Sequence, residues 1–548
     1  MYVDIAYKKQ NSKSYKRVLL RHNYREDGKI KHKTIANISN CTDEEIQAIK
    51  LALKNKKDLT QLGSFTDSVE SNQGLSVGAI LLLKHIADSL DITKALGNSI
   101  EGKLALWQVM ARIIGQGSRL SAVRLAQSHA VCDLLGIDNF TEDSLYKNLD
   151  WLSDNQEAIE ERLFALRCEG KEVSRLYLYD VTSSYLEGVE NELGEWGYNR
   201  DKKKGKKQIV IGLLTDEEGV PVSVEVFRGN TGDTKTVLSQ IKKLAERFKI
   251  KEVTIVGDKG MIKSVQIEDL KEANFNYITA ITKAQIESLI KEGIFQLELF
   301  SSELCEILSK DNVRYILRRN PHRAEEIEGN REDKIKKVKT MIEKQNIYLK
   351  EHEKAKVEVA QRKIQEIIKK LKLSEYVAVK AIERGLIIEI EEQLKEEVKR
   401  LDGCYVIKTE LSKEVAKEVI HNRYKDLALV EKGFRTMKTG YLETRPIYVR
   451  KEKRTRGHVF VVMLAYVMIQ ELQKIWSGVD IEVQEGVTEL SSISNIEIII
   501  EGIKYNQIPE PRALGKKLLD LAGVKLPNSI PNKNGKVATI KKLPQRRK

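Results

Sequence analysis

Two aspartates in this sequence each end a run of strand-like, apolar residues. Asp180 ends the alternating run LYLYD, and Asp258 ends the run VTIVGD, directly before Lys259 and Gly260. Taken singly, each carboxylate fits a turn, because aspartate is a common turn former. If the two strands are neighbours in a sheet, the carboxylates converge and repel one another unless a divalent cation lies between them. The pair therefore leaves two interpretations open, turn residues or metal ligands.

A third acid lies in the stretch YKDLALVEKGFRTMK. Tyr424, Glu431 and Lys438 are seven residues apart (431 − 424 = 7 and 438 − 431 = 7), so a helix places them on one face. The predicted helix covers residues 413–438, and an apolar stripe beside this face would pack it on a sheet. The stripe consists of Leu427, Val430 and Phe434. An ordinary surface helix with a Glu–Lys face is the alternative.

Length and charge narrow the class of protein. The chain has 548 residues, which corresponds to roughly three or four domains. Lys and Arg exceed Asp and Glu by 94 − 80 = 14. Such an excess favours polyanionic partners such as nucleic acid, or it reflects a well-solvated, charge-rich surface.

The cysteines and the hydropathy of the chain indicate in which cellular compartment the protein is expected. The five cysteines are scattered without a CxxC pair, so neither a zinc ribbon nor a disulfide framework is indicated, and a reducing cytosol is expected. The first ten residues lack the apolar segment of a signal peptide. The longest apolar run, Val459–Ile469, is shorter than the about 20 residues that a membrane span needs. We therefore expect a soluble protein without a membrane partner.

Changes in periodicity divide the chain into five parts. Strand-like runs in the middle of the chain stop at an amphipathic, charge-rich stretch at 331–373 and return in YVAVKAI and GCYVIKT. One α/β domain is thus split by an insertion. The predicted parts are a small β-rich unit at 1–60 with a turn at Asp27-Gly28, an α-helical domain at 75–170, a catalytic domain at 175–283 and 401–476, a largely helical insertion at 284–400, and a C-terminal region at 477–548 with a basic tail from residue 533.

Further expectations concern two connections, the α-helical domain and one C-terminal helix. A polar linker is expected at 61–74, and the segment DEEG (216–219) is expected to form a hairpin turn. The α-helical domain either presents a recognition helix to a DNA end or is a bundle without DNA contact. Residues 458–476 are expected to form a helix.

The three acidic stretches together resemble the DDE transposases of bacterial insertion sequences. The most similar subgroup has its last acid in a Tyr-x2-Arg-x3-Glu-x6-Lys box. Tyr424, Glu431 and Lys438 match this box, whereas Leu427 occupies its Arg position, with Arg423 or Arg435 as substitutes. The resemblance spans about residues 180–470 and includes the segments DVTSSYLEG, GYNRDKKKGKKQIVIGLL, GDKG and RPIYVRKEKRTRGHVFVVMLAY.

This resemblance implies a fold, a reaction and a cofactor. It implies an α/β fold with an RNase H-like mixed sheet flanked by helices. It also implies that Asp180, Asp258 and Glu431 are catalytic and hold two Mg²⁺ ions, with Mn²⁺ as an alternative and Asp180 as the bridging ligand. Two such ions clamp the attacking and leaving oxygens of a phosphodiester. Water first cleaves a strand at the element's end, and the freed 3′-OH then attacks target DNA, so no covalent intermediate on Tyr424 is required.

The implied partners are double-stranded DNA, as the terminal inverted repeats of the element and as target, and a second copy of the chain in a synaptic homodimer. The implied location is the bacterial cytoplasm, in association with the nucleoid. Candidate DNA contacts are basic or aromatic side chains near the acids and in the runs RDKKKGKK and KEKRTRGH. They are Tyr424, Lys438, Arg435, Arg423, Lys203, Lys204, Lys206, Arg454, Arg456 and His458.

Several of these positions have structural alternatives. The run RDKKKGKK also fits a solvated turn, and His458 fits a helix-cap histidine. Trp196 is expected in the core and Tyr198 on a splayed base, and Asp402 is expected in a turn. The hydroxyl residues that follow Asp180 are expected to support a metal or to contact phosphate. They are Thr182, Ser183 and Ser184.

Two rival functions remain at this level. One is an RNase H-like enzyme of another purpose, either a structure-specific DNA nuclease or an inactive relative. The other is a non-catalytic DNA-binding protein built from the basic surface and the helical domain. Joining of a 3′-OH end to a second duplex separates a transposase from a nuclease, and loss of cleavage on replacing the acids excludes the non-catalytic protein.

Overall fold

The computed structural model describes residues 1–10, 13–26, 28–57, 69–445, 447–500, 503–530 and 535–538. Asp27 of the predicted turn, most of the predicted linker and most of the basic tail lie outside these residues. The described residues divide into two compact units. One contains Met1–Leu75, Ser494–Pro509 and Pro527–Ile530, and the other contains Ser76–Ile493, Glu510–Leu526 and Pro531–Lys548.

The first unit begins with an antiparallel meander of β1 (Tyr2–Gln10), β2 (Lys13–Glu26) and β3 (Lys29–Asn37). The helix α1 (Asp43–Lys54) follows, and Thr42 and Glu45 form a capping box at its N-terminus. The predicted strands are thus confirmed. A further sheet contains β4 (Val69–Ser76), β16 (Ser494–Ile500) and β17 (Ile503–Gln507), so residues 69–74 form a strand where a linker was expected.

The second unit is built on a mixed sheet. Its strands are β6 (Leu176–Tyr185), β7 (Gln208–Asp216), β8 (Pro221–Arg228), β9 (Thr254–Gly257), β10 (Asn276–Ala280), β11 (Cys305–Leu308), β12 (Arg314–Arg319) and β15 (Cys404–Thr409), in the order β11-β12-β15-β10-β9-β6-β7-β8. Within it, β8, β7 and β6 are antiparallel neighbours, whereas β6, β9 and β10 are parallel. This topology is that of an RNase H-like core, and the predicted α/β fold class is confirmed.

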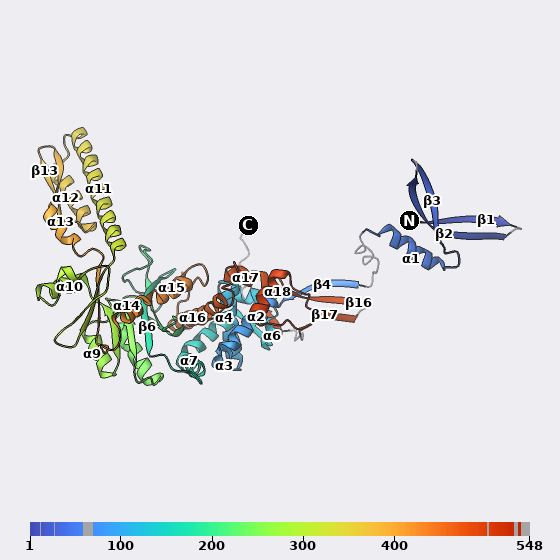
Figure 1. Ribbon diagram of the computed structural model, residues 1–548, viewed down its shortest axis with the longest axis horizontal. Helices are drawn as coiled ribbons and strands as arrows, with labels where there is room; N and C mark the ends of the chain where they lie inside the picture. The colour runs from blue at the N-terminus through green and yellow to red at the C-terminus, as the bar shows by residue number, and fades with distance from the viewer. Residues whose placement is uncertain are drawn as a thin grey trace. The chain divides into compact units, whose positions relative to one another are not determined.

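Helices cover both faces of this sheet (Figure 1). Alternate side chains of β6 point to opposite faces. Tyr177, Tyr179 and Val181 share a core with α8 (Asp233–Lys242) and α9 (Ser264–Glu272). On the other face, α15 (Leu427–Lys438) contacts β6 and β7, and α14 (Lys417–Lys425) contacts β9 and β10. The hairpin turn at DEEG forms as predicted, with Gly219 at φ +78°.

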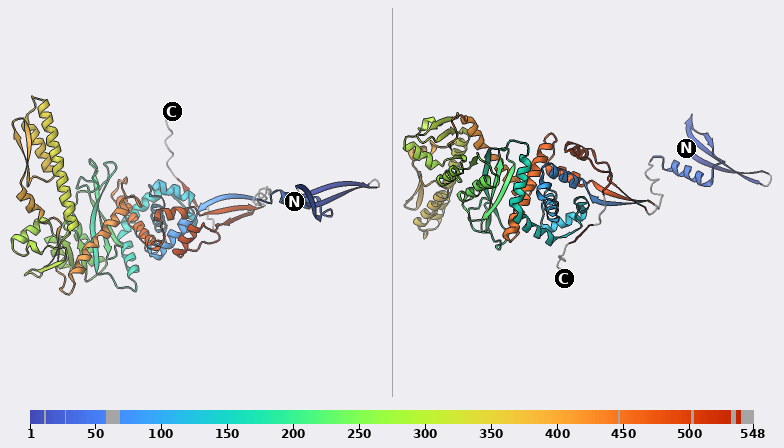
Figure 2. Two further views of the ribbon diagram at one scale, coloured as in Figure 1. Left: turned by 45° about the horizontal axis from the view of Figure 1, so that its top comes forward. Right: turned by 90° about the horizontal axis from the view of Figure 1, so that it is seen from below.

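The insertion is smaller and less helical than predicted. Residues 284–319 contain α10 (Lys283–Lys291) and then β11 and β12, which extend the large sheet beside β15. The remaining part has a hydrophobic core of its own and stands out from the sheet in Figure 2. It consists of α11 (Pro321–Glu351), α12 (Val357–Lys370), β13 (Val377–Ile382), β14 (Gly385–Ile390) and α13 (Glu392–Lys399). YVAVKAI therefore forms a hairpin with β14 and does not join the catalytic sheet.

The helical region forms where the periodicity predicts it. Its members are α2 (Gly78–Ser89), α3 (Ile92–Leu96), α4 (Ile100–Gly115), α5 (Arg119–Ser128), α6 (Val131–Leu135) and α7 (Glu142–Cys168), with α16 (Glu452–Ile475), α17 (Val483–Ser491) and α18 (Ala513–Leu521) added from the C-terminal part. The helix α16 contacts α4, α7 and β8. It therefore joins the helical region to the catalytic sheet.

Among the described residues, α16 alone is long and apolar enough to cross a membrane, and 72% of its apolar window is buried inside the protein. The run Val459–Ile469 is buried throughout. These properties are those of a core helix.

The contact between α16 and α7 depends on Gly457. A Cβ atom at this position would lie 2.2 Å from the Leu149 carbonyl oxygen of α7. We expect Gly457→Ala to lower the free energy of unfolding by about 1–3 kcal/mol, because the two backbones must move apart. Urea unfolding measures the effect. Gly478→Ala, at a glycine with open space around its Cβ position, is the control, and equal stability of both variants would contradict the prediction.

Candidate active site

Asp180 and Asp258 lie on neighbouring parallel strands. The pairing of β6 with β9 ends at Tyr179 opposite Gly257, so the two acids follow the last paired residues side by side. The strand β6 does not end there, because it stays paired with β7 as far as Tyr185. Asp180 is therefore not a turn residue, and the hydroxyl residues 182–184 belong to the strand.

Asp180 is largely shielded from solvent. Burial raises the pKa of its carboxyl group to about 7, opposed by the backbone N–H of Val181, and the charges of Asp258 and Glu431 raise it further. Asp258 and Glu431 themselves are exposed. The three acids thus share one region of electrostatic influence, with one desolvated carboxylate and two that face solvent.

The predicted helix at 413–438 is two helices. Asp426 ends α14 and begins α15, so Tyr424 lies on the first and Glu431 and Lys438 on the second. The Tyr424 hydroxyl donates a hydrogen bond to Asp258 Oδ1 at 3.2 Å. Burial, with Asp258 as the next contributor, raises the pKa of this phenol. Tyr424 is thereby kept as a neutral donor.

Lys438 is held at the other side of the acids. Its Nζ donates to Thr182 Oγ1 at 3.0 Å and to the Ser183 carbonyl oxygen at 2.6 Å, and it pairs with Asp201 at 2.6 Å. Burial lowers the pKa of Lys438, and the hydrogen bond that its ammonium donates to Asp201 opposes this shift. Lys438 thus fastens the C-terminal end of α15 to β6.

Asp201 is a site residue that the sequence did not single out. Its side chain is only 2% exposed, and it accepts hydrogen bonds from the backbone N–H of Tyr185, from Lys438 and from Arg445. It is the acid within the basic run RDKKKGKK. The presence of a single acid within a basic run was the one sequence feature that could have pointed to Asp201.

The lysines of that run differ in their surroundings. Lys206 pairs with Glu187 at 2.6 Å, Lys203 lies 5.7 Å from the centre of the Tyr185 ring, and Lys204 is exposed. Arg200 forms two 2.8 Å hydrogen bonds with Asp233. The run is therefore an ordered loop with free charge at its tip.

The two aromatic residues before this run are both on the surface. Trp196 is 59% exposed and Tyr198 is 83% exposed. The expectation that Trp196 packs in the core is wrong.

The arginines near the box residues point away from the acids or into solvent. Arg423 pairs with Glu217 at 3.1 Å and with Asp426 at 3.5 Å. Arg435 is exposed.

The second basic run binds α16 to α7. Arg454 pairs with Asp150 at 3.2 Å and lies over the Tyr146 ring, whereas Lys453 pairs with Asp154. Arg456 pairs with Glu452, one turn earlier on α16. These charges already have protein partners.

His458 is buried in the helical region. Burial lowers the pKa of its imidazole well below 6.5, and the guanidinium groups of Arg112 on α4 and Arg119 on α5 lower it further. A hydrogen bond to the backbone of Thr444 acts in the opposite direction. The side chain is not accessible to phosphate, which corrects its assignment as a DNA contact.

This burial gives a testable pH dependence. Because the folded protein keeps His458 neutral, only the unfolded chain takes up its proton as the pH falls below about 6.5. We expect the free energy of unfolding to fall by up to about 1.4 kcal/mol per pH unit from this group. Urea unfolding at pH 7 and pH 5 measures the loss, which should be smaller in His458→Gln. An unchanged loss in that variant would contradict the prediction.

Asp402, a further candidate acid, binds a residue of the insertion. It forms a buried ion pair with Arg331 of α11. Asp402 therefore connects the insertion to the segment that enters β15.

The carboxylates fit a divalent cation by their chemistry. Hard oxygen donors of this kind are those that Mg²⁺ prefers. Burial is the main cause of the raised pKa of Asp180, and a cation would relieve the smaller contribution from repulsion by Asp258 and Glu431. Among the described residues, no group of three or more His, Cys, Asp or Glu side chains stands close enough together to hold a metal ion.

Family models match two parts of the chain. The model described as "Transposase DDE domain" matches residues 172–468, and that described as "IS1634 family transposase, N-terminal domain" matches residues 3–65. A search of curated proteins finds no match.

Two solved structures are similar over part of their lengths. A piggyBac transposase synaptic complex with hairpin DNA is 8% identical with a TM-score of 0.36, covering 81% of this chain and 79% of that one. A Mos1 transposase paired-end complex with the left transposon end is 11% identical with a TM-score of 0.15, covering 27% and 52%.

Proposed function

Because this chain belongs to the DDE transposases, whose domain model matches residues 172–468, we propose that Asp180, Asp258 and Glu431 are its catalytic acids. The protein is a DDE-type DNA transposase, an enzyme that cleaves and transfers DNA strands. The observation that carries the assignment of the acids is their convergence from three elements. After burial, the charges of Asp258, which follows β9, and of Glu431 on α15 both raise the pKa of Asp180 on β6.

Members of this family depend on divalent metal, and we propose two Mg²⁺ ions held by Asp180, Asp258 and Glu431, with Mn²⁺ as a substitute. Bound there, the ions would supply Lewis acidity at the attacking and leaving oxygens. Asp180 is the proposed shared ligand, since its strand β6 pairs with β9, which Asp258 follows, and contacts α15, which carries Glu431.

The remaining residues position these acids. Tyr424 donates to Asp258 Oδ1, which leaves the other carboxylate oxygen free for a cation. Lys438 ties α15 to Thr182 and Ser183 and thereby sets the distance of Glu431 from Asp180. These two donors, together with the match to the Tyr-x2-Arg-x3-Glu-x6-Lys box at three of its four positions, support membership in that subgroup.

We propose that DNA lies across the exposed acids and the basic loop at 200–207. Lys203 and Lys204 at the loop and Arg435 on α15 are the proposed backbone contacts, since exposed cations neutralise phosphates and release counterions. Lys206, Arg423, Arg454 and Arg456 would first have to leave the carboxylates that they pair with.

The proposed substrates are the terminal inverted repeats of the element and target DNA. The proposed assembly is a homodimer that holds two ends together. We propose that the protein is soluble and cytoplasmic and associates with the nucleoid through DNA binding.

Strand transfer tests the proposed reaction. The full-length protein, given Mg²⁺, a duplex carrying the element's end and a second duplex, should join the 3′-OH of the first to the second. Sequencing of the joint identifies the linked strand. Cleavage without joining, under conditions where a pre-cleaved end is also not joined, would favour the structure-specific nuclease.

A further inference from the structure

A cavity of about 730 Å³ lies between the catalytic sheet and the insertion. Asp258 and Tyr424 of the proposed site line one part of it, and residues of α11 and the segment after α12 line another. Its volume falls in the range of sites that enclose organic ligands. The cavity is thus continuous with one side of the acids.

Among the charged residues that line this cavity, cations outnumber acids. The lining contains six cationic side chains and three acidic ones. The cations are Lys259, Lys283, Arg323, Arg331, Lys334 and Lys372, and the acids are Asp258, Glu375 and Asp402. The pair between Arg331 and Asp402 is internal to the wall. The excess positive charge therefore belongs mainly to the lysines.

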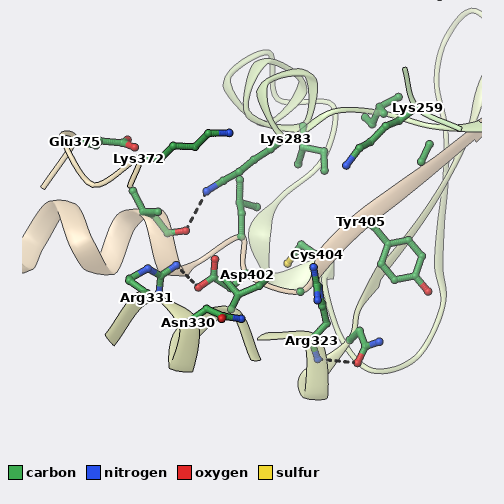
Figure 3. A pocket seen from close by; sticks show the side chains of 18 of the residues that line it. Lys259, Lys283, Arg323, Asn330, Arg331, Lys372, Glu375, Asp402, Cys404 and Tyr405 are labelled. Atoms are coloured by element: carbon green, nitrogen blue, oxygen red, sulfur yellow. Dashed lines mark hydrogen bonds and ion pairs between the residues drawn. The ribbon is translucent and has the colours of Figure 1, made fainter. Parts of the chain in front are cut away.

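Three of these lysines are available to a ligand. Within residues 69–445, the amino groups of Lys259, Lys334 and Lys372 have no hydrogen bond or ion pair, whereas Lys283 donates to the Val398 carbonyl oxygen at 3.1 Å. In Figure 3, Lys372 and Lys259 lie on opposite sides of the view, and Lys283 lies between them. Such a set of point charges suits a phosphate-rich ligand.

Lys372 occupies a backbone position that lysine disfavours. Its φ is +60°, and it ends α12 with the hydrogen bonds of a Schellman motif, from Leu373 N–H to the Ile368 carbonyl and from Lys372 N–H to the Lys369 carbonyl, both 3.1 Å. Glycine is the favoured residue there, since it has no Cβ to strain the left-handed conformation. A strained residue whose free ammonium lines a cavity points to a role in binding.

We propose that this cavity binds the phosphodiester backbone of the DNA strand next to the scissile phosphate, with Lys372 as a phosphate contact supplied by the insertion. The inference rests on the proposed function, because the acids place the scissile phosphate beside Asp258 and Tyr424, which also line the cavity. A DNA strand continuing past them meets Lys259 and then the lysines of the insertion.

Lys372→Gly separates binding from folding. The change removes the ammonium and the backbone strain together, so the Tm should rise while DNA affinity falls. In EDTA, anisotropy of a fluorescein-labelled duplex with the full-length protein should show about three- to tenfold weaker binding at moderate salt. The slope of log K against log salt should also become shallower by about 0.9, the value of one lost phosphate contact.

Lys249→Gly is the matched control. Lys249 has φ +55° and follows the π-helix η2 (Lys243–Arg247), outside the cavity, and the N–H of Ile250 donates to the Leu244 carbonyl at 3.1 Å. This variant should gain Tm with unchanged DNA affinity. Wild-type affinity and slope in Lys372→Gly would overturn the proposal, as would an equal loss of affinity in Lys249→Gly.

Inorganic phosphate distinguishes DNA from a free anion as the ligand. If phosphate raises the Tm of the wild type but not of Lys372→Gly, while both proteins bind DNA equally, the cavity is a free-anion site and the proposal fails. Because binding is measured without metal, it is independent of cleavage. Failure of the proposed reaction would instead appear as absence of cleavage and joining by the wild type.

Discussion

Asp180→Asn is expected to lower DNA cleavage by about 10³-fold or more. Catalytic groups that act as a unit lose most of their joint effect when one is removed, and an amide lacks the charge that a divalent cation requires. The change keeps the size of a side chain that is largely shielded from solvent. Gel assays of end cleavage in Mg²⁺ measure the loss, and Asp258→Asn and Glu431→Gln should show losses of the same order.

Duplex affinity in EDTA should survive all three changes. Asp154→Asn, at a surface acid whose side chain is 51% exposed, controls for the loss of one negative charge and should cleave as the wild type does. Retained cleavage in Asp258→Asn would remove that residue from the proposed site, and lost duplex binding in all three variants would point to a folding defect.

Asp201→Ala is expected to have the second largest effect. The side chain is 2% exposed and pairs with Lys438 and Arg445, whose side chains are 11% and 27% exposed. Removing one partner leaves shielded charges unpaired, which typically costs about 3–5 kcal/mol when the pair is buried. Since both cations retain some exposure, a loss of about 2–3 kcal/mol in the free energy of unfolding is expected here.

Cleavage by Asp201→Ala should also fall, because Lys438 is then free to leave Thr182 and α15 is released at its C-terminal end. Asp201→Asn is the informative companion, since its amide oxygen still accepts from the Tyr185 N–H. The free energy of unfolding of Asp201→Asn should lie between those of the wild type and of Asp201→Ala. Wild-type cleavage in Asp201→Ala at a temperature where it is fully folded would show that Lys438 needs no such support.

The convergence of the first two acids was predictable because it depends on local pattern. LYLYD and VTIVGD are short apolar runs of the kind that parallel neighbours need, and the register of β6 with β9 confirms their pairing. The helix around Glu431 was predicted from its spacing, but the break at Asp426 was not. Asp426 keeps helical dihedral angles, φ −62° and ψ −14°, so the sequence periodicity hardly registers the change of helix.

Contacts between segments that are distant in the sequence could not be predicted from it. Arg454 pairs with Asp150 across 304 residues, and Arg445 pairs with Asp201 across 244 residues. A basic run has the same composition whether its charges meet carboxylates or solvent. The strand β12 was assigned to the insertion because its partner β15 follows it in the sequence only after α11, α12 and α13.

The interruption of the sheet has a consequence for the protein during its synthesis. Glu431 is made 431 − 180 = 251 residues after Asp180, with the separate core of the insertion in between. At about 5–20 residues per second, the ribosome needs about 13–50 s for this stretch. On the proposed assignment of the acids, a chain that ends between Asp258 and Glu431 carries two of them without the third and is expected not to cleave the chromosome from which it is being expressed. DNA breakage would then be restricted to chains whose translation has passed the insertion.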